Sequence, residues 1–149
     1  MKKTCKFIVI FAILTIFATF LAGCGSTKET SSKTREKNNI VTIDNFIEKL
    51  EDADMKVTDK INKSAQMIGA TEGYGLEIDG GYVEVYSYDI DSTNELTKSN
   101  IKSAKEKEIV TMPGFGNMEL KAKYNKGLVL VNFEEHPDSD KILEVFNNL

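Results

Sequence analysis

The sequence predicts a single α+β domain over residues 40–149, in which an antiparallel sheet of about five strands packs against helices. Three observations support this prediction. Apolar residues alternate on both sides of a glycine turn at 79–81, the segment 128–133 is nearly continuous in apolar residues, and segments with helical periodicity precede, separate and follow these strands. Because the strands come in groups rather than in strict alternation with helices, an antiparallel sheet is favoured. The length suits one domain and is too short for two.

The domain begins with a predicted helix. Thr42 or Asp44 can cap its N-terminus, and its apolar positions recur with the helical period. These positions are Ile43, Phe46, Ile47 and Leu50. The segment 61–68 predicts a second, shorter helix that ends at Gly69.

The stretch YGLEIDGGYVEVYSYD (74–89) gives the strongest local signal in the chain. Its alternation around 79–81 predicts a β-hairpin with a two-residue primed turn. The second strand places valines on one face and three tyrosines, Tyr82, Tyr86 and Tyr88, on the other. Tyrosine rings offer flat apolar area with a polar edge, so these three are candidate binding residues. Cross-strand packing on a half-covered sheet face is the alternative interpretation.

A helix and a short strand follow the hairpin. The sequence from Ser92 to Glu95 matches a capping box and opens a helix that runs to about residue 107, with Leu96, Ile101 and Ala104 facing inward. A short strand over 109–112 then leads into MPGFG (112–116). Proline and two glycines force a turn there around Phe115, which is a further candidate binding residue.

Two strands and a helix complete the domain. Residues 118–124 alternate and predict a strand with one solvent-exposed face, and a turn at 125–127 leads into 128–133. A strand that is apolar on both faces is covered on both, so we expect 128–133 to lie centrally. Asp138 or Ser139 caps a final helix with Ile142 and Phe146 among its apolar positions. The predicted order is α(α)ββαβββα.

His136, the only histidine, supplies the best candidate for catalytic chemistry. With Ser139 and the nearby acids it has the side chains of a hydrolase triad, although sequence neighbours on a strand-to-helix turn rarely reach that geometry. These acids are Glu134, Glu135, Asp138 and Asp140. The alternative is a loop that leads into a helix. One histidine without a thiol does not make a zinc site, and the sequence predicts no catalytic residue and no cofactor.

Carboxylates cluster at Asp89, Asp91 and Glu95. Oxygen ligands of this kind suit Ca²⁺, which makes these residues weak candidates for a calcium site. The alternative is a favourable interaction between acids and the N-terminus of the following helix.

The N-terminal segment has the pattern of a secretion signal. Lysines at positions 2, 3 and 6 precede an apolar run over 7–21. About 15 residues of helix rise about 22 Å, short of the roughly 30 Å hydrocarbon core, so a signal is favoured over a transmembrane span. The sequence Leu21-Ala22-Gly23-Cys24 resembles the lipobox of bacterial lipoproteins. That resemblance implies removal of residues 1–23 and a diacylglyceryl thioether on Cys24; the alternative is an ordinary secretory signal with a leftover cysteine.

Residues 24–39 are rich in Ser, Thr and Lys and lack large apolar side chains, so we interpret them as a flexible tether between the lipid and the domain. Residues 40–149 carry 12 basic and 21 acidic side chains. Phosphate binding needs the opposite sign, so a nucleic-acid partner is not expected.

As a whole, the lipobox, the polar tether and the segments 66–89 and 128–146 resemble the small uncharacterised lipoproteins of low-GC Gram-positive bacteria. The resemblance implies a lipid anchor on the outer face of the cytoplasmic membrane and assigns no catalytic residue. We predict a non-catalytic binding module for a protein, peptide or small ligand. The alternatives are an envelope hydrolase that uses His136 or paired carboxylates, and an immunity protein against cationic peptides.

Overall fold

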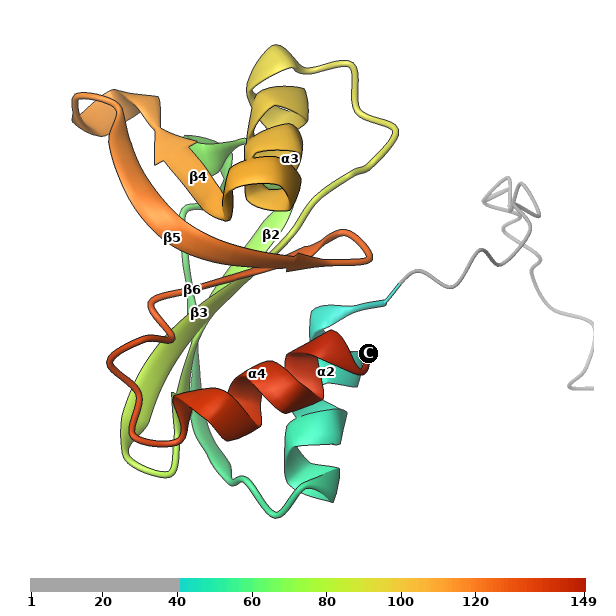
Figure 1. The fold of residues 1–149 in the computed structure, drawn as a ribbon, viewed down its shortest axis with the longest axis vertical. Helices are drawn as coiled ribbons and strands as arrows, with labels where there is room; N and C mark the ends of the chain where they lie inside the picture. The colour runs from blue at the N-terminus through green and yellow to red at the C-terminus, as the bar shows by residue number, and fades with distance from the viewer. Residues whose placement is uncertain (1–40) are drawn as a thin grey trace, which may run out of the picture. The chain divides into compact units, whose positions relative to one another are not determined.

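Six antiparallel strands form one sheet in the order β1-β2-β3-β6-β5-β4 (Figure 1). The computed structural model describes residues 41–149, so the predicted signal 1–23, Cys24 and the tether 24–39 lie outside the described residues. The elements in chain order are α2 (Ile43–Asp52), β1 (Val57–Asn62), η1 (Ala65–Ile68), β2 (Glu72–Ile78), β3 (Gly81–Ser87), α3 (Glu95–Lys107), β4 (Ile109–Met112), η2 (Pro113–Phe115), β5 (Met118–Asn125), β6 (Leu128–Val131) and α4 (Ser139–Asn147). The α+β prediction is confirmed, with six strands and the order αβββαβββα.

Two short turns set the register of the sheet. Asp79 and Gly80, with φ of 46° and 83°, join β2 to β3, and Lys126 and Gly127, with φ of 45° and 92°, join β5 to β6. Positive φ at both central positions defines the type I′ turn, whose twist matches that of the strands. The predicted hairpin with a primed turn at 79–81 is therefore confirmed.

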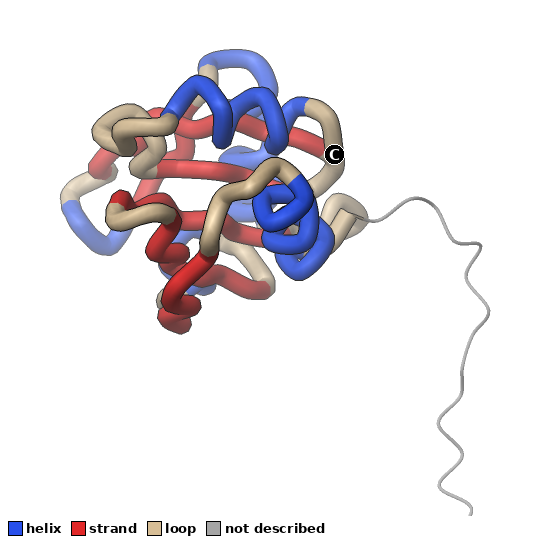
Figure 2. The backbone as a smooth tube through the Cα atoms, turned by 90° about the horizontal axis from the view of Figure 1, so that it is seen from below, coloured by secondary structure: helices blue, strands red, loops and turns tan. Residues whose placement is uncertain are grey.

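Strand β6 lies between β3 and β5 and is buried on both faces, as its continuous apolar sequence predicts. Leu128 and Leu130 contribute to a core shared with α2 and α4. Val129 and Val131 contribute to a second core, which includes Ala104 of α3. Figure 2 shows the strands between helical segments on either side.

Helices α2 and α4 cover the first face through apolar side chains. Phe46 of α2 and Phe146 of α4 are fully buried and meet edge to face, with ring centroids 5.4 Å apart and planes at 82°. The predicted cap at Thr42 is confirmed, because its hydroxyl accepts from the Asn45 backbone N–H while its own N–H donates to the Asn45 side chain. No helix in residues 41–149 combines the length and the apolar character needed to cross a membrane.

Helix α3 covers the second face with a more polar surface than predicted. Thr97, Asn100 and Ala104 are its buried residues, whereas Leu96 and Ile101 are only partly buried. The helix is also capped two residues later than the capping box predicted, because the Asn94 side chain accepts hydrogen bonds from the backbone N–H groups of Leu96 and Thr97.

The predicted helix over 61–68 is wrong in its first half. Residues 57–62 form the edge strand β1, in which Ile61 pairs with Gly75 of β2, and only Ala65–Ile68 forms a helical turn, of the 3₁₀ type. Five of the six β1 residues are exposed, so the strand has no buried side to produce an alternating apolar pattern. The predicted end at Gly69 is confirmed, since Gly69 adopts φ of 73°.

Candidate functional site

A hollow of about 530 Å³ opens where β6 leaves the sheet. Tyr82 of β3 lies on one side, residues 119–121 of β5 lie on the other, and Asn132, Glu134 and Glu135 of the loop between β6 and α4 complete the lining. The hollow therefore combines one aromatic ring, three carboxylates and one lysine with the apolar side chain of Leu120. Its volume falls within the range of about 300–1,000 Å³ that is common for ligand sites.

The loop from Asn132 to Asp138 turns out of the line of β6 at its first residue. Asn132 adopts φ of 58°, which ends the strand, and the next side chain, Phe133, is buried in the core beneath α2 and α4. Only asparagine, aspartate and glycine adopt this left-handed backbone conformation readily. The hollow is the space that β6 would occupy if it continued.

His136 fixes the far end of this loop. It is buried, its Nε2 lies 2.8 Å from the carbonyl oxygen of Ile78, and its Nδ1 accepts a hydrogen bond from the backbone N–H of Asp138 at 3.0 Å. Because Nδ1 accepts, Nε2 carries the proton and donates to Ile78. The ring also lies against Gly81, where a Cβ atom would come within 2.4 Å of it. In this geometry both ring nitrogens bind backbone groups, so His136 positions the loop against the β2–β3 turn and has no free nitrogen for a substrate.

The tyrosine face of β3 carries a network of polar contacts centred on Glu84. Its carboxylate accepts hydrogen bonds from the hydroxyls of Tyr82 at 3.0 Å and Tyr86 at 2.6 Å, and lies 2.9 Å from Lys63 Nζ. Burial raises the pKa of Glu84, but the hydrogen bonds from Tyr86, Lys63 and Tyr82 outweigh it and hold the pKa below its ordinary value. Burial, followed by the hydrogen bond to Glu84, raises the pKa of Tyr86. The network keeps an ionised carboxylate on a largely covered surface.

Two glycines of β2 make room for the tyrosine rings. A Cβ atom at Gly73 would lie 2.4 Å from the Tyr86 ring, and one at Gly75 would lie 2.2 Å from the Tyr82 hydroxyl. Tyr86 and Tyr88 are only 4% and 5% exposed, and the Tyr88 hydroxyl donates to the carbonyl of Ile68 at 3.1 Å. Cross-strand packing therefore accounts for Tyr86, packing against η1 accounts for Tyr88, and Tyr82 is the member of this row that reaches the hollow.

The other candidate residues lie apart from the hollow. Phe115 is 60% exposed on the turn between β4 and β5 and does not line it. Asp89 accepts a hydrogen bond from the backbone N–H of Asp91, and Glu95 forms an ion pair with Lys98 at 3.1 Å. Within residues 41–149 no group of three or more His, Cys, Asp or Glu side chains is placed to hold a metal ion.

Sequence reasoning identified Tyr82 and noted the acids Glu134 and Glu135, but it missed Glu119, Lys121 and Asn132. The first two stand on the polar side of a half-covered strand, where charged residues are expected for solubility alone. Nothing in the local pattern shows that β6 ends at Val131. The hollow exists because β6 ends there, so it could not be predicted without the tertiary structure.

The chain shows no significant similarity to a protein-family model, a curated protein or a solved structure. Its function therefore has to be inferred from its own residues.

Proposed function

We propose that this chain is a lipid-anchored binding module on the outer face of the cytoplasmic membrane, and that its domain binds a positively charged partner at the hollow beside Tyr82. The anchor is the part of the proposal that rests on the sequence Leu21-Ala22-Gly23-Cys24. The binding role rests on the hollow, and the one observation that carries it is the gathering of Glu119, Glu134 and Glu135 around a tyrosine ring.

The charge balance of the hollow supports a cationic partner. Glu134 is paired with Lys121, with Oε1 and Nζ 2.6 Å apart. Glu119 and Glu135 have no such ion pair among residues 41–149, so two carboxylates of the hollow are left to a ligand. Ammonium and guanidinium groups bind carboxylates through charge-assisted hydrogen bonds. The Tyr82 ring already has one such cation over it, because Lys63 Nζ lies 5.1 Å from the ring centroid, so the free carboxylates are the groups that attract a cationic ligand.

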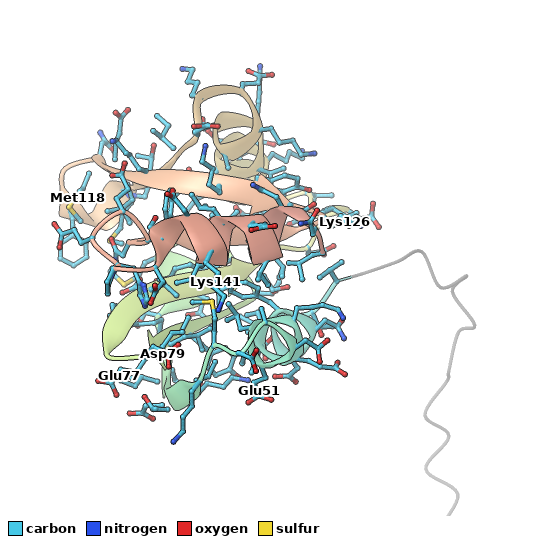
Figure 3. All side chains as sticks on the ribbon, turned by 60° about the horizontal axis from the view of Figure 1, so that its bottom comes forward. Glu51, Glu77, Asp79, Met118, Lys126 and Lys141 are labelled. Carbon is cyan, nitrogen blue, oxygen red and sulfur yellow. The ribbon has the colours of Figure 1, made fainter. Side chains whose placement is uncertain are left out.

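The binding role is tested by titrating the isotope-labelled protein with a short lysine-rich peptide and following backbone amide shifts. Glu119→Gln together with Glu135→Gln is expected to weaken binding about tenfold or more, and raised salt is expected to weaken it further. Glu51→Gln removes an exposed charge from α2, far from the hollow in sequence and outside its lining, and serves as the matched control (Figure 3). Amide shifts that spread over the whole surface, or that respond equally to both sets of variants, would contradict this site.

The anchor is tested separately. Cys24→Ala is expected to abolish labelling by a fatty-acid analogue and to release the protein from its normal membrane retention. Labelling that persists in the variant would rule out Cys24 as the attachment site. If the partner is a cationic antimicrobial peptide, deletion of the protein is expected to sensitise cells to such peptides.

A further inference from the structure

The hollow has the form of a missing strand segment. Strand β6 pairs with β3 only as far as Glu84↔Val131, and with β5 only as far as Ala122↔Val131. Its neighbours continue past that point, β3 over residues 81–83 and β5 over residues 118–121. Met118, labelled in Figure 3, marks the end of β5 that extends beyond β6.

Both flanking segments are held on their outer sides. Tyr82 pairs with Glu77 of β2, and Glu119 pairs with Thr111 of β4. The segments are therefore fixed as strands although no strand lies between them. At Val131 the single strand β6 separates β3 from β5, so the backbones of β3 and β5 lie about 9–10 Å apart at the usual strand spacing.

The alternation of backbone hydrogen bonds along β3 and β5 shows which backbone groups face the gap. The N–H of Tyr88 donates to Gly127 at 2.8 Å, on the side of β3 that faces β6. Since the direction of backbone groups alternates along a strand, the N–H and C=O of Tyr82, six residues earlier, face the same way and point into the gap. On β5 the N–H of Ala122 donates to Glu108 at 2.7 Å, on the side of β4. Lys121 and Glu119 therefore present their backbone groups to the gap from the opposite side.

We propose that this gap takes up an extended peptide that contains lysine or arginine and that completes the sheet between β3 and β5. The proposal rests on the proposed function and names its ligand class. The backbone of the peptide pairs with Tyr82 on one side and with Glu119 and Lys121 on the other. A peptide that runs in the direction of β6 is antiparallel to both flanking strands, because β6 itself is antiparallel to both. Backbone pairing supplies affinity, and side-chain contacts select the sequence.

The dimensions and charges of the gap define the peptide. The flanking segments span three residues on β3 and four on β5, which corresponds to about 10–13 Å of extended chain. The basic side chains of such a peptide reach Glu119 and Glu135 at the rim. Both outer edges of the sheet are less suited to this role. On β4 the outward-facing N–H and C=O of Thr111 are both hydrogen-bonded to the Asn100 side chain. On β1 the outward-facing N–H of Lys60 donates to the Asp59 side chain.

The test compares two probes that differ only in backbone donors. One is a capped tetrapeptide of alternating lysine and valine, and the other has the same side chains with N-methyl groups on alternate amides. We expect the N-methylated probe to bind at least about tenfold more weakly, which equals about 1.4 kcal/mol. Equal binding of both probes would overturn strand pairing and leave the acidic hollow as a binding site. Binding of neither would overturn the strand proposal and the proposed function together.

Two variants of Glu119 separate the contribution of its charge to peptide binding from that of its backbone N–H. Glu119→Gln removes the carboxylate and keeps the N–H, whereas Glu119→Pro also removes the N–H that faces the gap. Proline is tolerated in a strand where its nitrogen faces away from a pairing partner. We expect Glu119→Pro to bind the unmethylated probe several-fold more weakly than Glu119→Gln does. Equal affinities in two folded variants would contradict pairing on this side.

Hydrogen exchange gives a readout that does not depend on a variant. Addition of the unmethylated probe is expected to slow exchange at the amides of Tyr82, Glu119 and Lys121. The amide of Leu120 faces β4 and is expected to change little. The measurement is made on the chain from Cys24, with Cys24→Ser, and on the chain from Val41, because segment 24–39 is itself basic. Binding confined to the shorter chain would identify that segment as the occupant and overturn an external peptide.

Discussion

On one face of the sheet α2 and α4 pack through aromatic and aliphatic side chains, whereas on the other face α3 adds buried hydrogen bonds to an apolar core. Phe46, Leu50, Ile142 and Phe146 are fully buried on the first face. On the second face Asn100 is 1% exposed. Burial is therefore similar on the two faces, but the chemistry that accompanies it differs.

Asn100 shows what the polar face gains from this chemistry. Its side-chain amide donates to the carbonyls of Ile68 at 2.9 Å and Thr111 at 2.8 Å, and accepts from the Thr111 N–H at 2.8 Å. Thr97 donates to the carbonyl of Gly69 at 2.6 Å. These contacts join η1, α3 and β4, and they occupy the outer backbone groups of an edge strand. Occupied edge groups are not free to pair with another chain.

The largest effect is expected on the apolar face. Phe146→Ala removes a fully buried ring and its edge-to-face contact with Phe46, so we expect the free energy of unfolding to fall by about 3–5 kcal/mol. Urea unfolding followed by circular dichroism measures this loss. Phe115→Ala removes the same side chain from an exposed turn and is the matched control, with an expected change below about 0.5 kcal/mol. A loss of less than about 1 kcal/mol for Phe146→Ala would mean that α4 is not part of the core.

Asn100→Leu tests the polar face directly. A buried leucine leaves both the N–H and the carbonyl of Thr111 without their Asn100 partner, whereas the carbonyl of Ile68 keeps the Tyr88 hydroxyl. We therefore expect the free energy of unfolding to fall by about 2–3 kcal/mol despite the added apolar area. The amides of β4 are expected to exchange faster in this variant. Lys102→Leu, at an exposed position of α3, is the control for placing leucine in this helix. A variant that is as stable as the wild type would show that the hydrogen bonds of Asn100 contribute no net stability to the second face.

Gly69 and Gly80 separate steric crowding from backbone strain. Both adopt positive φ, of 73° and 83°, but a Cβ atom at Gly69 would lie 2.8 Å from the backbone nitrogen of Thr97, whereas nothing lies within 4 Å of one at Gly80. Gly80→Ala is expected to cost about 1 kcal/mol, the effect of strain alone.

Gly69→Ala has the same backbone strain and in addition pushes α3 away from η1. We expect it to lower the free energy of unfolding by about 1 kcal/mol more than Gly80→Ala does in the same urea experiment. Gly80→Val places a β-branched side chain at this position and is expected to lower the free energy of unfolding by about 1–3 kcal/mol, the range for a strained backbone conformation. If the two alanine variants are equally stable, the contact between η1 and α3 is looser than the distances indicate.

The comparison of the two faces also explains what the sequence could predict. Apolar side chains at helical spacing predicted the inward face of α2 and α4, and alternation with a glycine turn predicted the hairpin, because in both cases burial and local pattern agree. For α3 the apolar pattern correctly predicted the burial of Ala104, but Leu96 and Ile101 are only partly buried. The polar residues Thr97 and Asn100 are buried instead. Whether an asparagine is buried depends on backbone groups that the chain brings to it from distant positions, Ile68 and Thr111.

The same reasoning applies to the candidate site. Tyr82 could be singled out because three tyrosines share one face of a predicted strand. The burial of His136 and the gap beside Val131 could not be predicted, because both depend on where the loop after β6 packs. A loop composition rich in Glu, Pro and Asp predicts exposure and helix capping, and those local preferences carry no information about the distant Ile78 carbonyl.

The smallest effect concerns Glu84, the ionised group on the polar face. Tyr86, Lys63 and Tyr82 hold its pKa below the ordinary value of about 4.3 for glutamate in an unfolded chain. Between the two pKa values the folded protein keeps this carboxylate ionised while the unfolded chain takes up a proton. Glu84 therefore contributes stability that is fully present above about pH 5 and is lost as the pH falls through its folded pKa.

Urea unfolding of the wild type and of Glu84→Gln between pH 7 and pH 3 measures this contribution. We expect a constant difference in unfolding free energy down to about pH 5 and a narrowing difference below it, since glutamine keeps acceptor and donor groups but no titratable charge. Glu106→Gln removes an exposed carboxylate of α3 and controls for the change in net charge. The apolar face has no counterpart to this group, because its core residues carry no titratable side chain. Parallel curves for the wild type and Glu84→Gln over the whole range would mean that the contacts around Glu84 do not favour its ionised form.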